Sequence, residues 1–306
     1  MQEYRRAAKR QEQTMTNSMI GRNAYHHICR VAGLCRPAAL RRRVLMAWAR
    51  LRGKPIADSV PGLEKKMWLS PDEYYAHFYE SQRVVEPGVL EFLKKHITPG
   101  MTIFDIGANV GYMTLFCAGL TGENGRIIAI EPGQRAYDRL VANIELNHLR
   151  NVIPVREAVS DADGYESYCQ AVHSGEDVYN SLQSVDTPWT SADDFQTASI
   201  PVHRLDTLIE KSGWPVPDLV KVDVEGAERK VLRGMSEILR NGRTRILILE
   251  ISERYFGKFG YSIRDLVEEL ENNDFFCLEI GESGYLAELD MGNGTGRSRM
   301  MAAMRG

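Results

Sequence analysis

Short apolar segments alternate with longer amphipathic segments from residue 101 onward, and this alternation restricts the fold more than any other feature of the chain. The apolar segments are MTIFDI, GRIIAIE, NVIPVREAVS, DLVKVDVEG and TRILILEIS. Helical segments such as QRAYDRLVANIELNHL lie between them, which is typical of β-α-β units and a parallel sheet. We therefore predict an α/β, Rossmann-like fold with helices on both faces of the sheet. Right-handed crossovers bring the carboxyl ends of its strands to one ligand-binding edge.

The segments outside this alternation divide the chain into parts. Residues 1–60 are predicted to form a basic helical extension, residues 61–98 a helical lead-in, and residues 99–290 the α/β domain. Within this domain, the polar segment 160–200 is expected to be an inserted loop or hairpin over the site. FFCLEI and GYLAEL predict a closing antiparallel hairpin, and residues 291–306 are expected to be a mobile tail.

Charge is distributed unevenly along the chain. Residues 1–54 carry a net charge of +11 and the remainder carries −14. In LRRRVLMAWARL, a helical apolar stripe surrounded by arginines consists of Leu40, Val44, Trp48 and Leu51. Contact with a membrane surface through residues 38–52 is one interpretation. We favour the other, a helix that docks on the core or on a second copy in a homo-oligomer, because the stripe is short.

The remaining totals describe the class of protein. The chain has no run of roughly 18 apolar residues, and its N-terminus lacks the pattern of a secretory signal, so we expect a soluble, cytoplasmic protein, peripheral at the membrane if the basic helix binds lipid. Five scattered cysteines without paired spacing indicate reduced thiols. The spacing in HHICRVAGLC fits no standard metal site, although four of its side chains could bind a metal: His26, His27, Cys29 and Cys35.

A glycine-rich loop follows the first strand. The spacing is G-A-N-V-G, from Gly107 to Gly111, rather than the G-x-G-x-x-G of a dinucleotide site, and Asp105 stands two residues before it. A carboxylate there would repel a pyrophosphate and attract a cationic ligand, and S-adenosylmethionine carries both an ammonium and a sulfonium. The structural alternative is that Asp105 caps the turn into the next helix.

The second and third strands end in residues suited to an adenosine. IIAIEP ends in Glu131 and Pro132, and an acid at that point can accept hydrogen bonds from both ribose hydroxyls, as it also does in nicotinamide enzymes. Ala158 ends the third strand, where a small residue can flank an adenine. The same residue also suits ordinary strand-to-loop sequence.

The fourth and fifth strands end in acids. In KVDVEGAE, Lys221, Asp223 and Glu225 lie two residues apart and so share one face of a strand, and Glu250 closes RILILE. Their position at the ligand-binding edge favours catalysis, while the alternative is a salt-bridged turn with helix caps. A further hypothesis is a Mg²⁺ ion held by the three carboxylates Asp223, Glu225 and Glu250.

In order and spacing, these blocks resemble the FkbM family of S-adenosylmethionine-dependent methyltransferases. FDIGANVGYMTL, AIEPGQRAYDRLVANIELN, RLDTLIE, LVKVDVEGAERKVLRGM and ILILEIS carry the resemblance, which covers about residues 85 to 280. YNSL, at 179–182, is similar to another short motif of the family. The resemblance implies a class I methyltransferase fold, a seven-stranded sheet with one antiparallel strand. It also implies O-methylation of a hydroxyl on a saccharide, glycolipid or natural product. It implies nothing about residues 1–60.

The resemblance also implies roles for individual residues. Glu131 would hold the ribose of S-adenosylmethionine, and Asp223 with Glu225 would face the transferred methyl and the acceptor. His203 and Arg204 depart from the family pattern and are expected on the acceptor side. The methionine end of the cofactor would contact the first loop, through Asp105, Gly107, Ala108, Asn109 and Gly111.

Methylation of a hydroxyl requires a group that accepts its proton. The candidate bases are Asp223, Glu225, Glu250, His173 and His203. The rival hypotheses are a nicotinamide-dependent oxidoreductase, against which the acid before the glycine loop counts, and a non-catalytic module docked on a membrane. RNA methylation is a further alternative, but the acidic body of the chain argues against a nucleic-acid partner.

Overall fold

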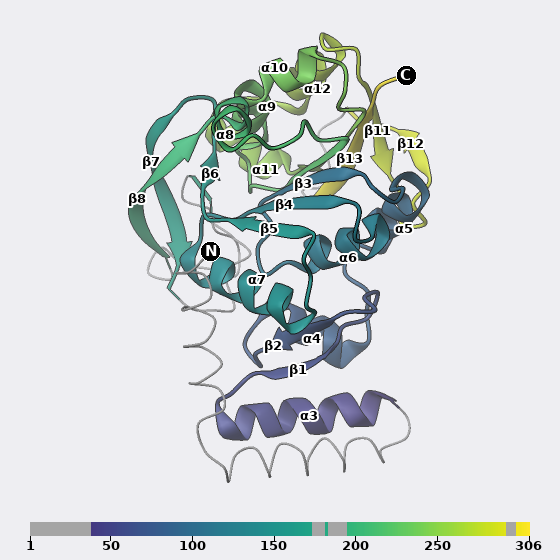
Figure 1. The fold of residues 1–306 in the computed structure, drawn as a ribbon. Helices are drawn as coiled ribbons and strands as arrows, with labels where there is room; N and C mark the ends of the chain where they lie inside the picture. The colour runs from purple at the N-terminus through teal and green to yellow at the C-terminus, as the bar shows by residue number, and fades with distance from the viewer. Residues whose placement is uncertain (1–37, 173–180, 183–194, 292–297) are drawn as a thin grey trace.

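An eight-stranded sheet forms the centre of the computed structural model, which describes residues 38–172, 181–182, 195–291 and 298–306 (Figure 1). Five parallel strands lie in the order β5 (Val152–Val155), β4 (Arg126–Ile130), β3 (Thr102–Ile106), β9 (Leu219–Val222) and β10 (Ile246–Ile251). Beyond β10 follow the antiparallel β13 (Arg299–Met304), β11 (Phe276–Ile280) and β12 (Leu286–Glu288). The predicted α/β sheet and its closing hairpin, β11 with β12, are confirmed. The seven strands from β5 to β11 form a class I methyltransferase sheet, to which β12 adds an edge strand.

The strand β13 contradicts the prediction of a mobile tail over residues 291–306. Its side chains Met301, Ala302 and Ala303 are fully buried, because the strand lies inside the sheet between β10 and β11. The prediction failed for a physical reason. The segment RMMAAM has none of the β-branched or aromatic residues that mark a strand, and its partners lie far back in the sequence. Burial between β10 and β11, rather than local preference, determines the conformation of β13.

Helices cover both faces of the sheet, as predicted. One face carries α5 (Pro87–His96), α6 (Tyr112–Thr121) and α7 (Gln134–Leu146), and the other carries α8 (Leu205–Ser212), α9 (Glu228–Gly234), α10 (Ser236–Arg240) and α12 (Ile263–Glu271). Successive strand residues point to opposite faces, so Ile103 packs against the first group and Phe104 against the second. By the same alternation, Asp105 and Lys221 share the face of α5, α6 and α7.

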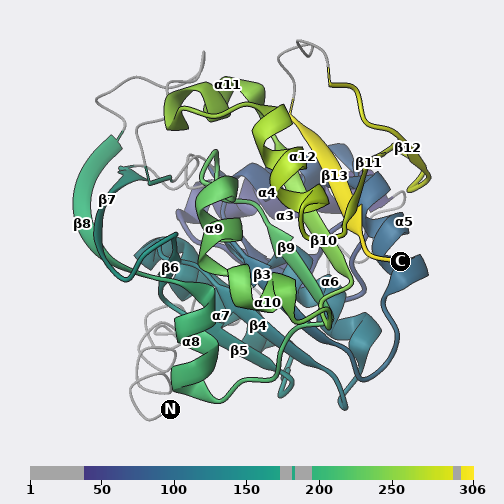
Figure 2. The same cartoon turned by 90° about the horizontal axis from the view of Figure 1, so that it is seen from above.

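The segment predicted as an insertion contains a second, three-stranded sheet. Its strands are β6 (Ala158–Val159), β7 (Gly164–Ala171) and β8 (Phe195–His203), and β7 and β8 form the antiparallel hairpin that the sequence allowed. NVIPVREAVS, predicted as one strand, therefore splits, because β5 pairs with β4 whereas β6 pairs with β8. Figure 2 shows this hairpin on the side of the molecule away from β13.

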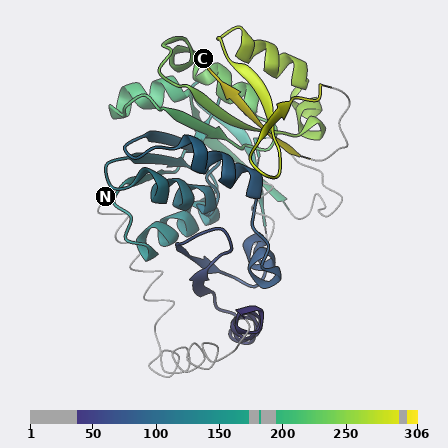
Figure 3. The same ribbon diagram turned by 90° about the vertical axis from the view of Figure 1, so that its right-hand side faces the viewer.

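Residues 38–81 form an N-terminal layer under the α7 side of the sheet (Figures 1 and 3). The layer contains α3 (Ala38–Arg52), β1 (Ile56–Ser59), β2 (Lys66–Leu69) and α4 (Tyr74–Ser81). The antiparallel pair of β1 and β2 places one strand in the predicted extension and one in the predicted lead-in, so neither segment is wholly helical. The helices of the lead-in are α4 and α5, and α5 begins at Pro87, where fixed φ favours the first turn.

The basic helix α3 docks on the core, as we favoured. Its buried residues are Leu45, Met46 and Ala49, so the buried face lies beside the predicted stripe. Val44 and Trp48 of that stripe are partly buried, whereas Leu40 and Leu51 are 49% and 85% exposed. In the part of the chain that the structure describes, no helix combines the length and apolarity needed to cross a bilayer. The histidines and cysteines of HHICRVAGLC lie outside the described residues.

Candidate active site

A pocket of about 310 Å³ opens at the carboxyl ends of β3, β4, β9 and β10. It brings together ten of the eleven predicted site residues: Asp105, Gly107, Ala108, Asn109, Glu131, Pro132, Ala158, Asp223, Glu225 and Glu250. The eleventh, Gly111, does not line it. Gly111 starts α6 with φ 94° against the side chain of Leu140, and so has a packing role.

The glycine loop joins three strands at the floor of the pocket. The amides of Gly107 and Ala108 both donate to the carbonyl of Ile130 on β4, at 2.9 and 3.0 Å. Gly107 has φ 80°, and a Cβ at this position would collide with the carbonyl oxygen of Asp223. Glycine is therefore required by both the backbone conformation and the close approach of β9.

Asp105 lies at the base of the pocket and is 1% exposed. Its Oδ2 accepts a hydrogen bond from the Thr114 hydroxyl at 2.6 Å, and its Oδ1 is buried without a hydrogen-bond partner. Burial raises the pKa of this carboxyl, although Lys221, opposite it on β9, works in the other direction. Hydrogen bonds from the side chain and the backbone of Thr114, in the first turn of α6, also lower the pKa of Asp105, so the alternative that Asp105 caps the turn into this helix stays open.

Lys221 is the one basic side chain among the described residues that line the pocket. It is 4% exposed, and its Nζ lies 2.7 Å from Oδ2 of Asp223. Burial lowers the pKa of this amine, but the charges of Asp223 and Asp105 outweigh burial and raise it. Lys221 therefore stays charged and fixes the carboxylate of Asp223 at the strand end.

Glu131 is held by backbone amides on both of its oxygens. Its Oε1 accepts from the amide of Gly133 at 2.8 Å, and its Oε2 accepts from the amide of Asn109 at 2.9 Å. These bonds fix the carboxylate before any ligand is present and tie the end of β4 to the glycine loop. A carboxylate oriented in this way can still accept hydrogen bonds, since each oxygen has two lone pairs.

Three acids converge on the opposite side of the pocket. Oxygen atoms of Asp223, Glu225 and Glu250 all lie within 4.8 Å of one another. Burial raises the pKa of Glu225 well above its usual range, and the charge of Glu250 adds to this increase. Burial, followed by Asp223, raises the pKa of Glu250, whose Oε2 is buried without a partner. The cluster can therefore take up a proton or bind a cation more readily than carboxylates in water.

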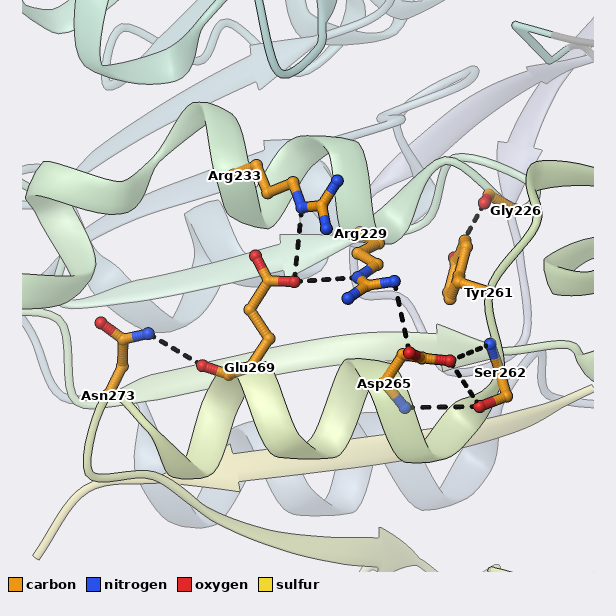
Figure 4. Close-up of polar contacts among 8 residues, drawn as sticks. All are labelled: Gly226, Arg229, Arg233, Tyr261, Ser262, Asp265, Glu269 and Asn273. Carbon is orange, nitrogen blue, oxygen red and sulfur yellow. Dashed lines mark hydrogen bonds and ion pairs between the residues drawn. The ribbon is translucent and has the colours of Figure 1, made fainter.

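The turn that carries Glu225 is fixed from two sides. Glu225 has φ 54°, and Ser181, which lies in the predicted YNSL motif, donates to its carbonyl at 3.0 Å. From below, the Tyr261 hydroxyl donates to the carbonyl of Gly226 at 2.8 Å (Figure 4). Glu228 accepts from the amide of Gly226 at 3.2 Å. The left-handed backbone of Glu225 is thus imposed by its surroundings, which is typical of functional sites.

The helix α12 supports this turn from outside the pocket. Its first turn has a capping box, in which Ser262 and Asp265 exchange hydrogen bonds between side chains and backbone. Arg229 of α9 donates to Glu269 of α12 at 3.0 Å, and Arg233 lies 3.6 Å from the same oxygen (Figure 4). These contacts hold Tyr261 in the position from which it fixes Gly226.

Several pocket residues were not predicted from the sequence. Glu86 of the lead-in reaches the pocket together with Tyr74, Tyr75 and Tyr112. Other unpredicted lining residues come from β7, the short helix α11 (Glu253–Phe256) and the loops, namely Glu157, Tyr168, Leu182, Tyr255 and Ser298. The spacing of the strands gives no signal for Glu86, because it precedes the first β-α-β unit. The only local sequence signal at Glu86 is the proline that follows it, Pro87.

Two residues expected on the acceptor side do not line the pocket. The ring nitrogens of His203 face Asp163 at 3.2 Å and Glu157, a lining residue, at 3.6 Å. Arg204 pairs with Asp206 at 2.7 Å, away from the pocket. The acceptor-side location of both residues stays a prediction. His173, the other predicted histidine base, lies outside the described residues.

Comparisons with known proteins agree with this geometry. The hexuronic acid methyltransferase AglP of Haloferax volcanii is 28% identical over 166 residues, which are 54% of this chain and 62% of that protein. The protein-L-isoaspartate O-methyltransferase 1 of Arabidopsis thaliana is 32% identical over 92 residues, or 28% of this chain and 40% of that one. The matches thus span less than two thirds of either relative.

Solved structures give weaker likenesses. The methyltransferase FkbM of Methylobacillus flagellatus has a TM-score of 0.42 at 13% identity and covers 93% of this chain and 59% of its own. A putative methyltransferase of Streptococcus mutans, in complex with SAH, has a TM-score of 0.42 at 11% identity and covers 71% and 94%. The model of the methyltransferase FkbM domain matches residues 105–277, more than half of the chain. The chain therefore belongs to the FkbM methyltransferase family, the S-adenosylmethionine-dependent methyltransferases that its sequence resembled.

Proposed function

We propose that this protein transfers a methyl group from S-adenosylmethionine to a hydroxyl group of a saccharide, a glycolipid or a natural product. The observation that carries the proposal is a single pocket with two chemically different sides. A glycine loop with Asp105 and Glu131 forms one side, and the cluster of Asp223, Glu225 and Glu250 forms the other. The first side suits the cofactor, and the second suits a hydroxyl that must lose a proton.

The residues present fit S-adenosylmethionine. The unpartnered Oδ1 of Asp105 suits the ammonium group, and the oriented carboxylate of Glu131 suits the ribose hydroxyls. Gly107 leaves space that a side chain would fill, and Ala158 leaves room for an adenine. A pyrophosphate would instead face buried carboxylates, which disfavours the nicotinamide alternative.

The reaction is an in-line displacement at the methyl carbon. When bound, the cofactor supplies an electrophilic methyl on a sulfonium; the acceptor oxygen forms a bond to that carbon while the carbon–sulfur electron pair passes to sulfur. The hydroxyl proton must pass to a base, and the carboxylates of Glu225 and Glu250 are the groups of this chain suited to take it. Their raised pKa values bring them closer to the pH at which a general base works best.

The saccharide acceptor rests on two supports. A relative of this chain is named a hexuronic acid methyltransferase. In this chain, Tyr74 lines the pocket and is 40% exposed, and its ring meets that of Tyr75 edge to face at 5.3 Å. Aromatic rings of this kind offer an apolar surface for the face of a sugar ring beside a polar hydroxyl.

The Mg²⁺ hypothesis is retained as part of the proposal. An oxygen-only set of ligands from Asp223, Glu225 and Glu250 suits Mg²⁺, which would lower the pKa of the acceptor hydroxyl. If the ion takes part, chelation by EDTA abolishes methyl transfer and added Mg²⁺ restores it. Full activity in EDTA would exclude a role for the ion, so that a carboxylate of the pocket alone would accept the hydroxyl proton.

Mass spectrometry tests the proposed reaction. The protein is incubated with S-adenosylmethionine and hexoses, amino sugars, hexuronic acids or glycolipids, and a gain of one methyl on oxygen is expected for one class. Glu225→Gln is expected to lower kcat by about 10²- to 10⁴-fold, the range for loss of a general base, with cofactor binding unchanged. Methylation on nitrogen would contradict the proposed O-methylation. An active Glu225→Gln variant would contradict the role of Glu225 as the base.

A further inference from the structure

We propose that Glu86 is a second carboxylate for the cofactor, which binds the α-ammonium group of S-adenosylmethionine together with Asp105. The inference rests on the proposed use of this cofactor, and it is independent of the acceptor. Glu86 precedes the family match at residues 105–277, so the match assigns it no role. If correct, it makes the lead-in a functional part of the cofactor site.

The backbone at Glu86 is held in an unfavourable conformation. Glu86 precedes α5 with φ 44° and ψ 58°, in the left-handed region, and the residue before a proline normally favours an extended backbone. The start of α5 cannot shift, because Gly88 packs so closely on the carbonyl of Gly281 that a Cβ would collide with it. The surroundings thus impose a conformation that directs the Glu86 side chain into the pocket.

Two buried carboxylate oxygens in this pocket lack a hydrogen-bond donor. Oε2 of Glu86 and Oδ1 of Asp105 are both buried without a hydrogen-bond partner, and unpaired buried acceptors are costly. The charge of Lys221 lowers the pKa of both residues, but its Nζ hydrogen-bonds to Asp223 at 2.7 Å and to neither of these two oxygens. An ammonium group has three donors and can satisfy both acids at once.

Glu86 lies within electrostatic reach of acids in both parts of the pocket. Burial raises the pKa of Glu86 to about 7; Lys221 lowers this pKa, whereas Asp223 and Asp105 raise it. Glu86 in turn raises the pKa of Glu250, although Glu86 does not belong to the cluster of three acids, so the assignment to the cofactor rests on the unpartnered oxygens of Glu86 and Asp105. A ligand cation placed between Glu86 and Asp105 would relieve the repulsion between them.

Calorimetry with three ligands tests the assignment. S-adenosylmethionine carries an ammonium and a sulfonium, S-adenosylhomocysteine carries the ammonium only, and deaminated S-adenosylhomocysteine, with hydrogen in place of the α-amino group, carries neither. All three are titrated into the wild-type protein, Glu86→Gln and the matched control Glu91→Gln, a site on the same helix that pairs with Lys94 at the surface. We expect Glu86→Gln to weaken S-adenosylhomocysteine about 10- to 100-fold and the deaminated ligand less than about 2-fold, whereas Glu91→Gln changes neither.

Each other outcome overturns the assignment. If Glu86→Gln weakens the binding of S-adenosylhomocysteine and of its deaminated analogue equally, Glu86 has a structural role. If the affinity for neither ligand changes, Glu86 is not part of the cofactor site. If Glu86→Gln weakens S-adenosylmethionine but not S-adenosylhomocysteine, the side chain faces the sulfonium instead. Failure of the wild-type protein to bind any of the three ligands would reject the proposed cofactor itself, which is a separate result.

Discussion

Buried acids define the chemistry of this protein at the scale of single residues. Seven carboxylates and one amine line the pocket among the described residues. Two of the acids, Glu86 and Glu225, have left-handed backbones. Because buried like charges repel one another, such a pocket stays partly protonated until a cation enters. The enzyme is therefore expected to couple cofactor binding to proton release.

Cofactor affinity is expected to rise with pH around neutrality. The raised pKa of Glu86, about 7, means that its carboxyl is largely neutral below that pH and ionised above it, and only the ionised form pairs with an ammonium. The same shift, from 4.5 in the unfolded chain, costs the ligand-free protein stability as the pH rises from about 4.5 to 7, because the unfolded chain loses its proton first.

Titrations of S-adenosylhomocysteine between about pH 6 and 8 measure this dependence. At about pH 6, binding should release a proton, which appears as a dependence of the heat on the ionisation enthalpy of the buffer. Other titratable groups interact with Glu86, namely Lys221, Asp223, Asp105, Glu250, Tyr75 and Tyr112, so the slope should shrink in Glu86→Gln without vanishing. A slope that is unchanged in this variant would argue that Glu86 does not titrate on binding.

At the scale of elements, β13 shows what sequence patterns detect and what they miss. The parallel strands were predicted because strands buried on both faces are continuous apolar runs between amphipathic helices. β13 is equally buried, but its methionines and alanines have low strand preference, and its neighbours β10 and β11 are remote in sequence. Its conformation follows from the slot between those neighbours rather than from local preference.

A charge in β13 should therefore be far more harmful than a charge in the edge strand. Ala303→Asp would bury an unpaired carboxylate and is expected to lower the free energy of unfolding by more than about 4 kcal/mol. Ala287→Asp in β12, where the side chain is exposed, is the matched control and should cost less than about 0.5 kcal/mol. Urea denaturation measures both, and equal effects would mean that β13 does not occupy the sheet interior in solution.

The candidate site was predictable to the extent that it depends on strand ends. Asp105, Glu131, Asp223 and Glu250 were found because the ends of parallel strands meet at one edge. Glu86 was not, since its place depends on how the lead-in wraps around the sheet, and no local pattern encodes that path. The position of His203 at the end of β8, in the second sheet, was likewise not predictable from the order of the parallel strands.

At the scale of the whole molecule, the N-terminal layer and the sheet share one hydrophobic core. Leu45 and Met46 of α3 belong to the same buried cluster as Ile103 of β3 and Ala302 of β13. Polar contacts also link the layer to α7, because the amide of Trp68 donates to Asn143 at 2.8 Å and Arg139 pairs with Glu73 at 2.8 Å. Within the layer, Asp58 accepts hydrogen bonds from Arg41 and Tyr79. Domains that share a core usually unfold together.

Asp58→Asn should lower the stability of the whole molecule. The change removes the charge of the carboxylate that pairs with Arg41, and we expect a loss of about 2 kcal/mol, less than for a fully buried pair because the Arg41 side chain is 36% exposed. Glu80→Gln, which removes the more exposed pair with Arg50, is the control and should cost less than about 1 kcal/mol. Circular dichroism and tryptophan fluorescence should report one coincident transition. An early separate transition would show that the layer unfolds by itself.

The interior position of β13 also has a consequence for synthesis. On the ribosome, β10 is complete when residue 251 has been added, but the strand that covers its open edge ends only at residue 304. At about 5 to 20 residues per second, that edge stays unpaired for roughly 3 to 10 seconds, within reach of other nascent chains. The folding of the sheet is thus expected to lag behind the synthesis of β10, and chaperones that shield strand edges should raise the yield of folded protein.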